Sequence, residues 1–353
     1  MKAWLLLTFC IVHGGVSCAK EFRPSNFGIG FALHFDYGVV SVYHSNGSSS
    51  GIAKIEGSWA YKQMMHHQSW LDPEPYNSAP TRSVEDLSAL QSTVIGTQGL
   101  VHHLPPWLGG SKPDARVKIL RPMFKALNAA ALAYTDTTGM IVAVTFAAQP
   151  SKGLVLAARS AASGLAIKKA IVTEVSPASL AADANGLTTE PCHGDGDYSG
   201  KQLILAVDYS RSAFSSNLLS MECGLYDDLR VMVNTSLGLA DWSGDTHQTL
   251  AAELRRFIRP VHGMYDERLQ DVDSVLLTGE AGHNEKLRSV LQGVFGSSHT
   301  STLGVRAQHE DDAIDPLFAT SIGAAYYAWS LLQADCGVGP CGYLSGHGCI
   351  ADL

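Results

Sequence analysis

Apolar residues recur along the chain with two different spacings, one typical of strands and one typical of helices. In the first half, short apolar runs bounded by turn residues predict strands at residues 31–35, 39–43, 52–55, 141–146 and 169–175. Apolar positions three and four apart between Leu120 and Tyr134 predict an amphipathic helix, and residues 154–164 predict a second helix. Residues 60–115 are rich in Pro and His and predict no regular element.

The second half of the chain repeats this order. Strands are predicted at residues 203–207, 218–221, 229–233 and 275–277, and helices at residues 250–269, 287–295 and 322–332. Each half begins with a strand, an Asp (Asp36 or Asp208), a tight turn and two more strands, and continues with a helix, a strand and a helix. A repeated mixed sheet with helices on its faces indicates an α/β protein of two similar lobes, with a ligand expected in the cleft between them.

The composition is that of a folded chain. A length of 353 residues suits two lobes, and 46% hydrophobic against 16% charged residues permits a large core and argues against disorder. The net charge of −8, with no basic run longer than Arg255-Arg256, argues against a nucleic-acid-binding surface.

The first 18 residues have the pattern of a signal peptide. Lys2 precedes an apolar run at residues 4–12, and small residues at 16–18 predict cleavage before Ala19. A buried first strand is the alternative. No other stretch reaches the length of a membrane span. We therefore expect a chain without a transmembrane segment in the secretory pathway, either extracellular or in the lumen of the endoplasmic reticulum.

The cysteines and two sequons fit that compartment. Five cysteines remain after residue 18, and Cys336, Cys341 and Cys349 crowd a Gly-rich tail, where their spacing matches no zinc motif and favours a short disulfide loop. The odd number leaves one thiol free or paired outside the chain. Asn46 and Asn234 each begin an Asn-x-Ser sequon and are predicted glycosylation sites.

Two stretches that accompany predicted strands have the marks of phosphate-binding turns. Residues 35–41 read FDYGVVS and resemble the motif Asp-x-Gly-Thr-Thr; residues 208–214 read DYSRSAF and resemble Asp-x-Gly-Gly-Gly-Thr-Phe. Both motifs belong to the nucleotide-binding domain of the seventy-kilodalton heat-shock chaperones. In that family the Asp holds a water on Mg²⁺ and the glycines let backbone N–H groups approach the phosphates. Here Val39 and Val40 replace both Thr residues, and residues 210–212 replace all three glycines.

Four further stretches resemble the same family in the same order. Residues 171–181 resemble the segment that connects the lobes, and Glu174 aligns with the Glu that orders the catalytic water. Gly238 keeps one glycine of a Leu-Gly-Gly motif. Residues 275–284 resemble the adenosine loop, in which Gly279 and Gly282 stand while Glu280 replaces the second glycine and His283 replaces the Arg, if that position is occupied at all. Residues 311–325 match the closing Gly-Ala-Ala helix of the family at Gly323, where a glycine is expected to permit close helix packing.

The resemblance implies two ribonuclease-H-like lobes of the actin-like ATPase fold. Lobe I would span residues 19–185 and lobe II residues 186–321, with a closing helix and a Cys/Gly-rich tail at residues 322–353. The second lobe would lack most of its outer subdomain, because only about thirty residues separate Trp242 from Val275. The catalytic Lys of the family has no clear counterpart, and Lys62 and Lys112 are candidates by position alone.

Two functions follow from the resemblance. The first is a pseudo-ATPase that serves as a scaffold or binding protein for a protein partner and needs no cofactor. The second is a residual ATP-binding protein or slow ATPase, with ATP or ADP and Mg²⁺ as ligands. In the second, Asp36 and Asp208 organise the metal, Glu174 and Asp208 serve catalysis, and nucleotide contacts come from Asp36, Gly38, Gly238, Gly279 and Gly282. Positioning and electrostatics supply most of phosphoryl-transfer catalysis, so the replaced glycines favour the first function.

Other motifs carry less information. Residues 47–51, GSSSG, fit the nucleophile-elbow pattern, but a strand rather than a helix is predicted to follow. The pairs His66-His67 and His102-His103 point to opposite faces if they lie on strands, so neither chelates a metal simply. Residues 193–197, HGDGD, lack the later acidic ligand of a calcium loop and are better read as a linker turn.

Overall fold

The computed structural model describes residues 26–67, 114–138, 140–165, 167–173, 175–187, 202–259, 272–295 and 314–335. Several predictions lie outside the described residues: the signal peptide, Lys112, Glu174, residues 193–197 and the cysteines of the tail. In the described part the protein is an α/β structure with two mixed sheets.

The first sheet is built from the strands that the first half of the chain predicts. Its order is β3-β2-β1-β4-β5, in which β1, β2 and β3 are antiparallel neighbours and β4 and β5 run parallel to β1. The strands are β1 (Phe27–Leu33), β2 (Tyr37–His44), β3 (Ser49–Glu56), β4 (Met140–Phe146) and β5 (Ile167–Val172).

The second sheet has the order β8-β7-β6-β9 and repeats the first four positions of the first sheet. Its strands are β6 (Gln202–Tyr209), β7 (Phe214–Glu222), β8 (Leu225–Asn234) and β9 (Ser274–Thr278). Cys223 and Gly224, with φ of 54° and 76°, form the two-residue turn between β7 and β8, as a hairpin with this twist requires. Cys223 is also disulfide-bonded.

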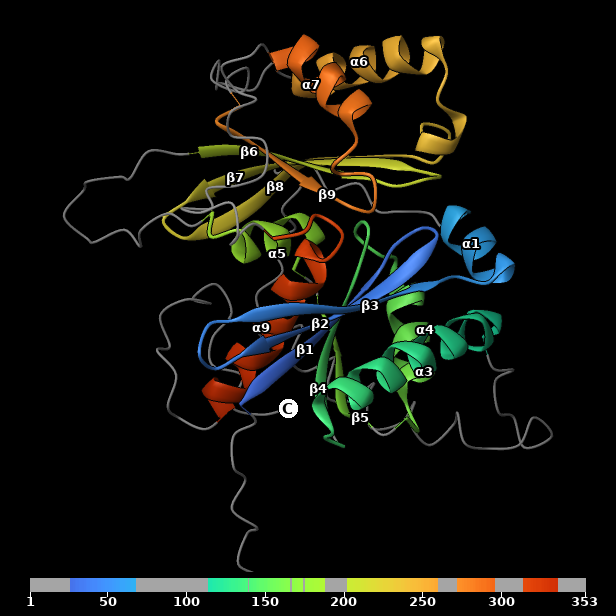
Figure 1. The fold of residues 1–353 in the computed structure, drawn as a ribbon, viewed down its shortest axis with the longest axis vertical. Helices are drawn as coiled ribbons and strands as arrows, with labels where there is room; N and C mark the ends of the chain where they lie inside the picture. Colours follow the sequence, from blue (N-terminus) through green and yellow to red (C-terminus); the bar gives the residue numbers. More distant parts are fainter. Residues whose placement is uncertain are drawn as a thin grey trace, which may run out of the picture.

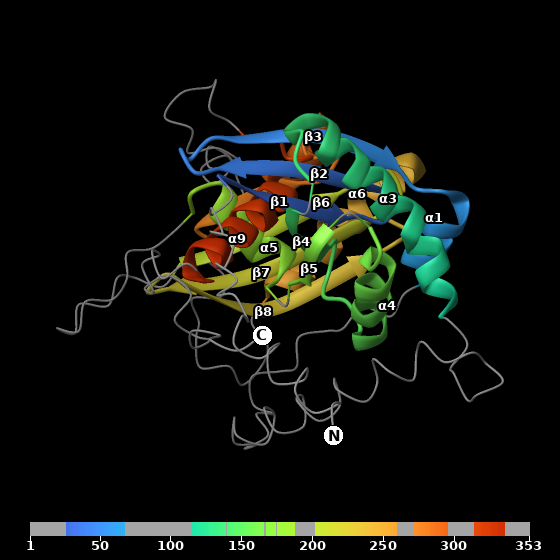
Figure 2. The same cartoon turned by 90° about the horizontal axis from the view of Figure 1, so that it is seen from below.

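Helices cover both faces of each sheet (Figure 1). In the first sheet, Ile29, Phe31 and Leu33 pack toward α3 and α4, while the alternate residues Gly28 and Gly30 face α9. Figure 2 shows α9 on one side of this sheet and α3 with α4 on the other. The helices are α1 (Trp59–His66), α3 (Ala115–Thr135), α4 (Lys152–Ala162), α5 (Pro177–Ala184), α6 (Gly244–Ile258), α7 (Glu285–Phe295) and α9 (Ala319–Asp335).

The two sheets share a central helical layer. On the second sheet, Leu205 and Val207 pack toward α6 and α7, while Ile204 and Ala206 pack against α5. The helices α5 and α9 contact each other, and α9 also lies along β1, β2 and β4. The last described helix therefore returns to the first sheet, and the layers run α3/α4, first sheet, α5/α9, second sheet, α6/α7.

Glycines allow the central layer to be this tight. A Cβ atom built on Gly323 of α9 would lie 1.9 Å from the carbonyl oxygen of Leu180 on α5. One built on Gly30 of β1 would lie 2.0 Å from the carbonyl oxygen of Ser321. Real Cβ atoms do not approach backbone so closely, so these positions accept only glycine without a shift of the helix. This confirms the packing role that the sequence predicts for Gly323.

Most predicted elements are confirmed, with three corrections. The first hairpin turn lies at residues 34–36 and not at residues 36–38, because β2 begins at Tyr37. Helix α1 was not predicted, although Ser58 caps it by accepting a hydrogen bond from the Tyr61 N–H. Helix α5 was also missed; Ser176 caps it, and Pro177 takes its first position, where a missing N–H does no harm.

None of the helices in the described part of the chain is both long enough and apolar enough to cross a membrane.

Candidate functional site

The turns of the first hairpin of each sheet meet where the two sheets approach each other. The strand-pairing registers show which residue of the first sheet corresponds to which residue of the second sheet. Ala32 lies opposite Val39 and beside Thr145, whereas Asp208 lies opposite Ser215 and beside Thr278. Asp208 therefore corresponds to Ala32. The predicted equivalence of Asp36 and Asp208 is wrong, because Asp36 stands within the turn and Asp208 on the strand.

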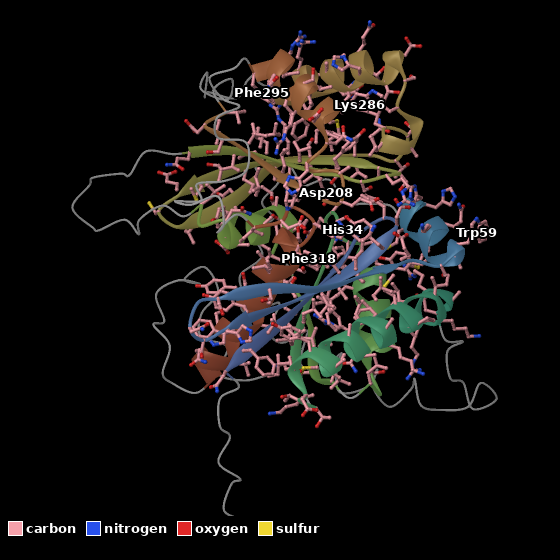
Figure 3. The ribbon with its side chains drawn as sticks, viewed as in Figure 1. His34, Trp59, Asp208, Lys286, Phe295 and Phe318 are labelled. Atoms are coloured by element: carbon pink, nitrogen blue, oxygen red, sulfur yellow. The ribbon has the colours of Figure 1, made fainter. Side chains whose placement is uncertain are left out.

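Asp208 and His34 nevertheless form one buried pair between the sheets (Figure 3). The His34 Nδ1 atom lies 3.2 Å from the Asp208 Oδ2 atom, and the side chains are 1% and 10% exposed. The Thr278 hydroxyl donates to the same Oδ2 atom at 3.2 Å. The His34 ring stacks on Tyr37 with its centroid 4.6 Å away. The pair thus joins the first turn of one sheet to two strand ends of the other.

Asp36 binds the turn between β6 and β7, residues 210–213, which we call the second turn. The Ser212 Oγ–H donates to the Asp36 Oδ2 atom. The Ser212 Oγ atom also lies 2.8 Å from the His66 Nε2 atom. The Asp36 Oδ1 atom lies 3.5 Å from that same Nε2. A Ser–His–Asp relay needs Ser and Asp on different ring nitrogens, so this cluster is not built for nucleophilic catalysis. The GSSSG motif is not a nucleophile elbow either, because its last three residues open β3.

Glu280 brings a carboxylate to the second turn. Its Oε1 atom accepts a hydrogen bond of 3.0 Å from the backbone N–H of Arg211, and its Oε2 atom is bound by the Nζ of Lys54, on β3 of the first sheet. The backbone N–H of Glu280 donates to the Tyr37 hydroxyl at 3.0 Å. We call these side chains the junction network: His34, Asp36, Tyr37, Lys54, His66, Asp208, Ser212 and Glu280.

The electrostatics of the junction network keep Lys54 charged and Tyr37 neutral. Burial alone would lower the pKa of Lys54, but its hydrogen bonds to Glu280 and Glu56 outweigh burial and raise the pKa, so the ammonium stays charged. Burial, reinforced by the nearby Asp208 carboxylate, raises the pKa of Tyr37 well above its ordinary value. The phenol stays neutral and remains a hydrogen-bonding partner for the Glu280 N–H.

Most backbone donors around the junction network are already used. In the second turn, the N–H groups of Ser210, Arg211 and Ala213 donate to the Ala213 oxygen, to Glu280 and to the Ser210 hydroxyl. All four N–H groups of residues 279–282 donate within the chain. The N–H of His34 donates to the Tyr37 oxygen. Loops that resemble phosphate cradles therefore present few free donors to a ligand.

The predicted glycines divide into two groups. Gly238 lies against the backbone of Arg211 and Ser212, Gly279 lies against Asp208 and Tyr209 with φ of 85°, and Gly282 lies against Pro316. These three border the junction network or its loops. Gly38, which follows Tyr37, differs from them, because a Cβ there would meet Met123 and Leu127 of α3. That Gly38 contacts a nucleotide stays a prediction.

The remaining predicted residues lie elsewhere. Asn46 follows β2, and Asn234 is the last residue of β8; the Oδ1 atom of each accepts hydrogen bonds from the N–H and hydroxyl of the Ser two residues on. Lys62 binds the exposed Glu56 carboxylate at 3.1 Å and does not contact the junction network. No group of three or more His, Cys, Asp or Glu side chains could share a metal ion among the residues that the structure describes.

Sequence reasoning missed His34 and Lys54 and gave His66 and Glu280 no role in binding. Lys54 and Glu280 are 226 positions apart, and Ser212 and His66 are 146 apart. No local pattern marks such pairs. The one available signal was the placement of Glu280 at a glycine position of the resembled loop.

Comparison with known proteins adds no assignment: no protein-family model and no curated protein matches the chain.

Ser212→Ala tests whether the junction network contributes to stability. Removal of this hydroxyl leaves a buried Asp36 oxygen without its donor, which is expected to lower the free energy of unfolding by about 1–3 kcal/mol. Ser163→Ala is the matched control, because that exposed hydroxyl donates only to the nearby Ser160 oxygen. Urea unfolding of both variants measures the difference. Equal stabilities would mean that the junction hydroxyl contributes nothing.

Proposed function

We propose that the chain is a degenerate relative of the nucleotide-binding domain of the seventy-kilodalton heat-shock chaperones, and that it acts as a non-catalytic scaffold or binding protein in the secretory pathway. One observation carries the proposal. The Glu280 carboxylate accepts a hydrogen bond from the Arg211 N–H and forms an ion pair with the Lys54 ammonium. It lies between turns that in the resembled family hold phosphate. The chain supplies its own anion to this position.

The repeated topology supports an actin-like arrangement of two lobes. Both sheets have the same order over four strands, and the hairpin turns of both point to one junction. In the proposed arrangement α5 and α9 form the layer between the lobes. Between β8 and β9 the described part of the second lobe has only a short 3₁₀ helix (Leu239–Asp241) and α6, which agrees with the proposed loss of most of the outer subdomain.

The residues present do not fit a bound Mg-nucleotide. A phosphate needs free N–H groups and close backbone approach, whereas the N–H groups of the second turn and of residues 279–282 are largely engaged. The counterpart of Asp208 on the first sheet is Ala32, so the second carboxylate of a metal pair is missing at that position. We therefore derive no catalytic step through nucleotide or metal.

One observation favours the alternative of residual ATP binding. The Oδ1 atom of Asp208 is buried and accepts no hydrogen bond from the described residues. A Cβ built on Gly279 would lie 3.0 Å from that oxygen, so the glycine avoids a tight contact there. A water-coordinated cation would satisfy such an oxygen.

Calorimetry with Mg-ATP and Mg-ADP on the purified chain separates the two functions. We expect no binding heat for the wild-type protein at micromolar concentrations, because the donors of the turns are occupied. Asp208→Ala is the control variant. Micromolar binding by the wild type that Asp208→Ala abolishes would overturn the pseudo-ATPase proposal and support the residual ATP-binding protein.

Two features support the proposed compartment. Both sequons lie at the ends of strands, and Asn46 is exposed, so it is open to a bulky modification. The disulfide at Cys223 is typical of an oxidising compartment. A scaffold in that compartment would act through its surface, because its junction is filled.

A further inference from the structure

Basic residues are concentrated in one part of the chain. Residues 114–173 contain eight Lys or Arg and two Asp, a net charge of +6 within a chain whose net charge is −8. The rest of the chain is correspondingly acidic. The basic residues are dispersed in sequence: Arg116, Lys118, Arg121, Lys125, Lys152, Arg159, Lys168 and Lys169.

The fold gathers six of these residues on one surface. Helices α3 and α4 lie side by side on the outer face of the first sheet (Figure 1). The Arg116 guanidinium of α3 lies next to Gly153 of α4, and the Arg121 Nη2 donates to the Ser163 oxygen at 3.1 Å. We call this surface the α3–α4 basic face; it consists of Arg116, Lys118, Arg121, Lys125, Lys152 and Arg159.

The charge of this surface is largely uncompensated. Arg116 binds the Asp114 carboxylate at 2.6 Å. Lys118, Arg121, Lys125, Lys152 and Arg159 are exposed, and none of these five forms an ion pair with a carboxylate of the described residues. Like charges this close repel one another, and a mobile or bound anion lowers that repulsion. The surface is therefore complementary to a polyanion.

The remaining exposed residues on α3 and α4 argue against a membrane surface and against a single-stranded nucleic acid as the partner. The apolar stripes, including Leu120, Phe124 and Leu154, are buried against the sheet, and Leu156 is the one large apolar side chain more than half exposed among the described residues of α4. A membrane-bound helix would need an exposed apolar face. The exposed aromatic ring on α3, Tyr134, lies nine positions beyond Lys125, roughly 13 Å along the helix axis. Base stacking on the basic face therefore lacks an aromatic platform.

We propose that the α3–α4 basic face binds a sulfated polysaccharide. A linear chain with recurrent sulfate groups matches basic side chains that are spread along two adjacent helices and need no pocket. Lys118 and Lys125 are two turns apart on α3, and Lys152 and Arg159 are two turns apart on α4, roughly 10 Å in each case. The site lies in the outermost helical layer, away from the junction network, and does not depend on whether that network binds nucleotide.

Binding to a heparin oligosaccharide in buffer of physiological ionic strength tests the proposal. The test variant replaces Lys118, Lys125, Lys152 and Arg159 with serine. The matched control replaces Arg255, Arg256, Lys286 and Arg288 with serine, which removes the same charge from α6 and α7 in the opposite outer layer. We expect the test variant to bind at least about tenfold more weakly than the control, which retains the wild-type affinity. Circular dichroism checks folding, and Lys118→Ser with Lys125→Ser provides a milder variant.

Three results would overturn the proposal. The first is that the wild type does not bind heparin. The second is that the two fourfold variants lose the same amount of affinity for heparin. The third is that the wild type binds vesicles of anionic phospholipid or single-stranded DNA more tightly than it binds heparin. Hyaluronan, a polysaccharide with carboxylates but no sulfates, tests the sulfate requirement. Binding of hyaluronan as tight as that of heparin would also contradict the proposal.

Discussion

Gly323→Ala is expected to lower the free energy of unfolding by about 3 kcal/mol or more, a larger loss than most single substitutions cause. The added methyl would lie 1.9 Å from the Leu180 oxygen and also 2.4 Å from the Leu180 carbonyl carbon. Backbone atoms cannot rotate away as a flexible side chain can. The helices α5 and α9 must separate, and α9 is held on its other side by Gly28 and Gly30 of β1. The strain therefore spreads through the whole central layer.

Gly293→Ala is the matched control for this prediction. Gly293 lies within α7, and a Cβ there would meet no atom within 4 Å. Both substitutions add the same methyl to a helix, where alanine is favoured over glycine by about 1 kcal/mol. We expect Gly293→Ala to be neutral or stabilising in urea unfolding. If Gly323→Ala proves as stable as Gly293→Ala, the close contact between α5 and α9 is not present in solution.

The second large effect is a loss of stability as the pH rises. Burial raises the pKa of Asp183, on α5, to about 6, although the hydrogen bond of 2.9 Å from the Tyr226 hydroxyl opposes this. In the unfolded chain the carboxyl has its ordinary pKa of 3.8. Between these two values the folded protein binds one more proton than the unfolded chain. The contribution of Asp183 to the free energy of unfolding is therefore fully present below pH 4. It is lost as the pH rises to 6, and the total loss is roughly 3 kcal/mol.

Asp183→Asn is expected to remove the pH-dependent contribution of this residue to the free energy of unfolding. The amide resembles the protonated carboxyl, so the variant should match the wild type near pH 4 and exceed its stability near pH 7. Asp227→Asn serves as control, because Asp227 is an exposed carboxylate on the same hairpin as Tyr226. Urea unfolding at a series of pH values gives the three profiles. A constant difference between Asp183→Asn and the wild type across the series would show that the pKa of Asp183 is not raised in the folded protein.

The periodicity of apolar residues was sufficient for most of the fold. The strands β4, β6 and β9 are visible in sequence as continuous apolar runs because both of their faces are buried. The helices α3 and α7 are visible because burial on one face sets the spacing of their apolar residues. Helix α5 was missed because it is buried between two sheets and five of its eight residues are buried, so it has no amphipathic stripe. The N-cap Ser176 followed by Pro177 was the available signal.

The junction was only partly predictable. The strand position of Asp208 was correct, but Asp36 was assigned to the matching position because the residues around it read as a strand, an Asp and a Gly. Strand pairing places the turn two residues earlier, and the alternation of side chains then makes Ala32 the counterpart. The contacts of His34 with Asp208 and of Lys54 with Glu280 join the two halves of the chain, and only the folded structure brings them together.

The position of α9 between the sheets also sets the order in which the protein can mature. Gly28 and Gly30 of β1 face residues 321–329, which leave the ribosome about 300 residues later. At roughly 5–20 residues per second, β1 waits on the order of 15–60 s for the helix that covers it. During this interval the face of β1 that carries these glycines lacks the helix that covers it in the folded structure. The protein therefore completes its core only late in synthesis, and a chain interrupted before α9 would leave that face open to aggregation or to capture by folding factors.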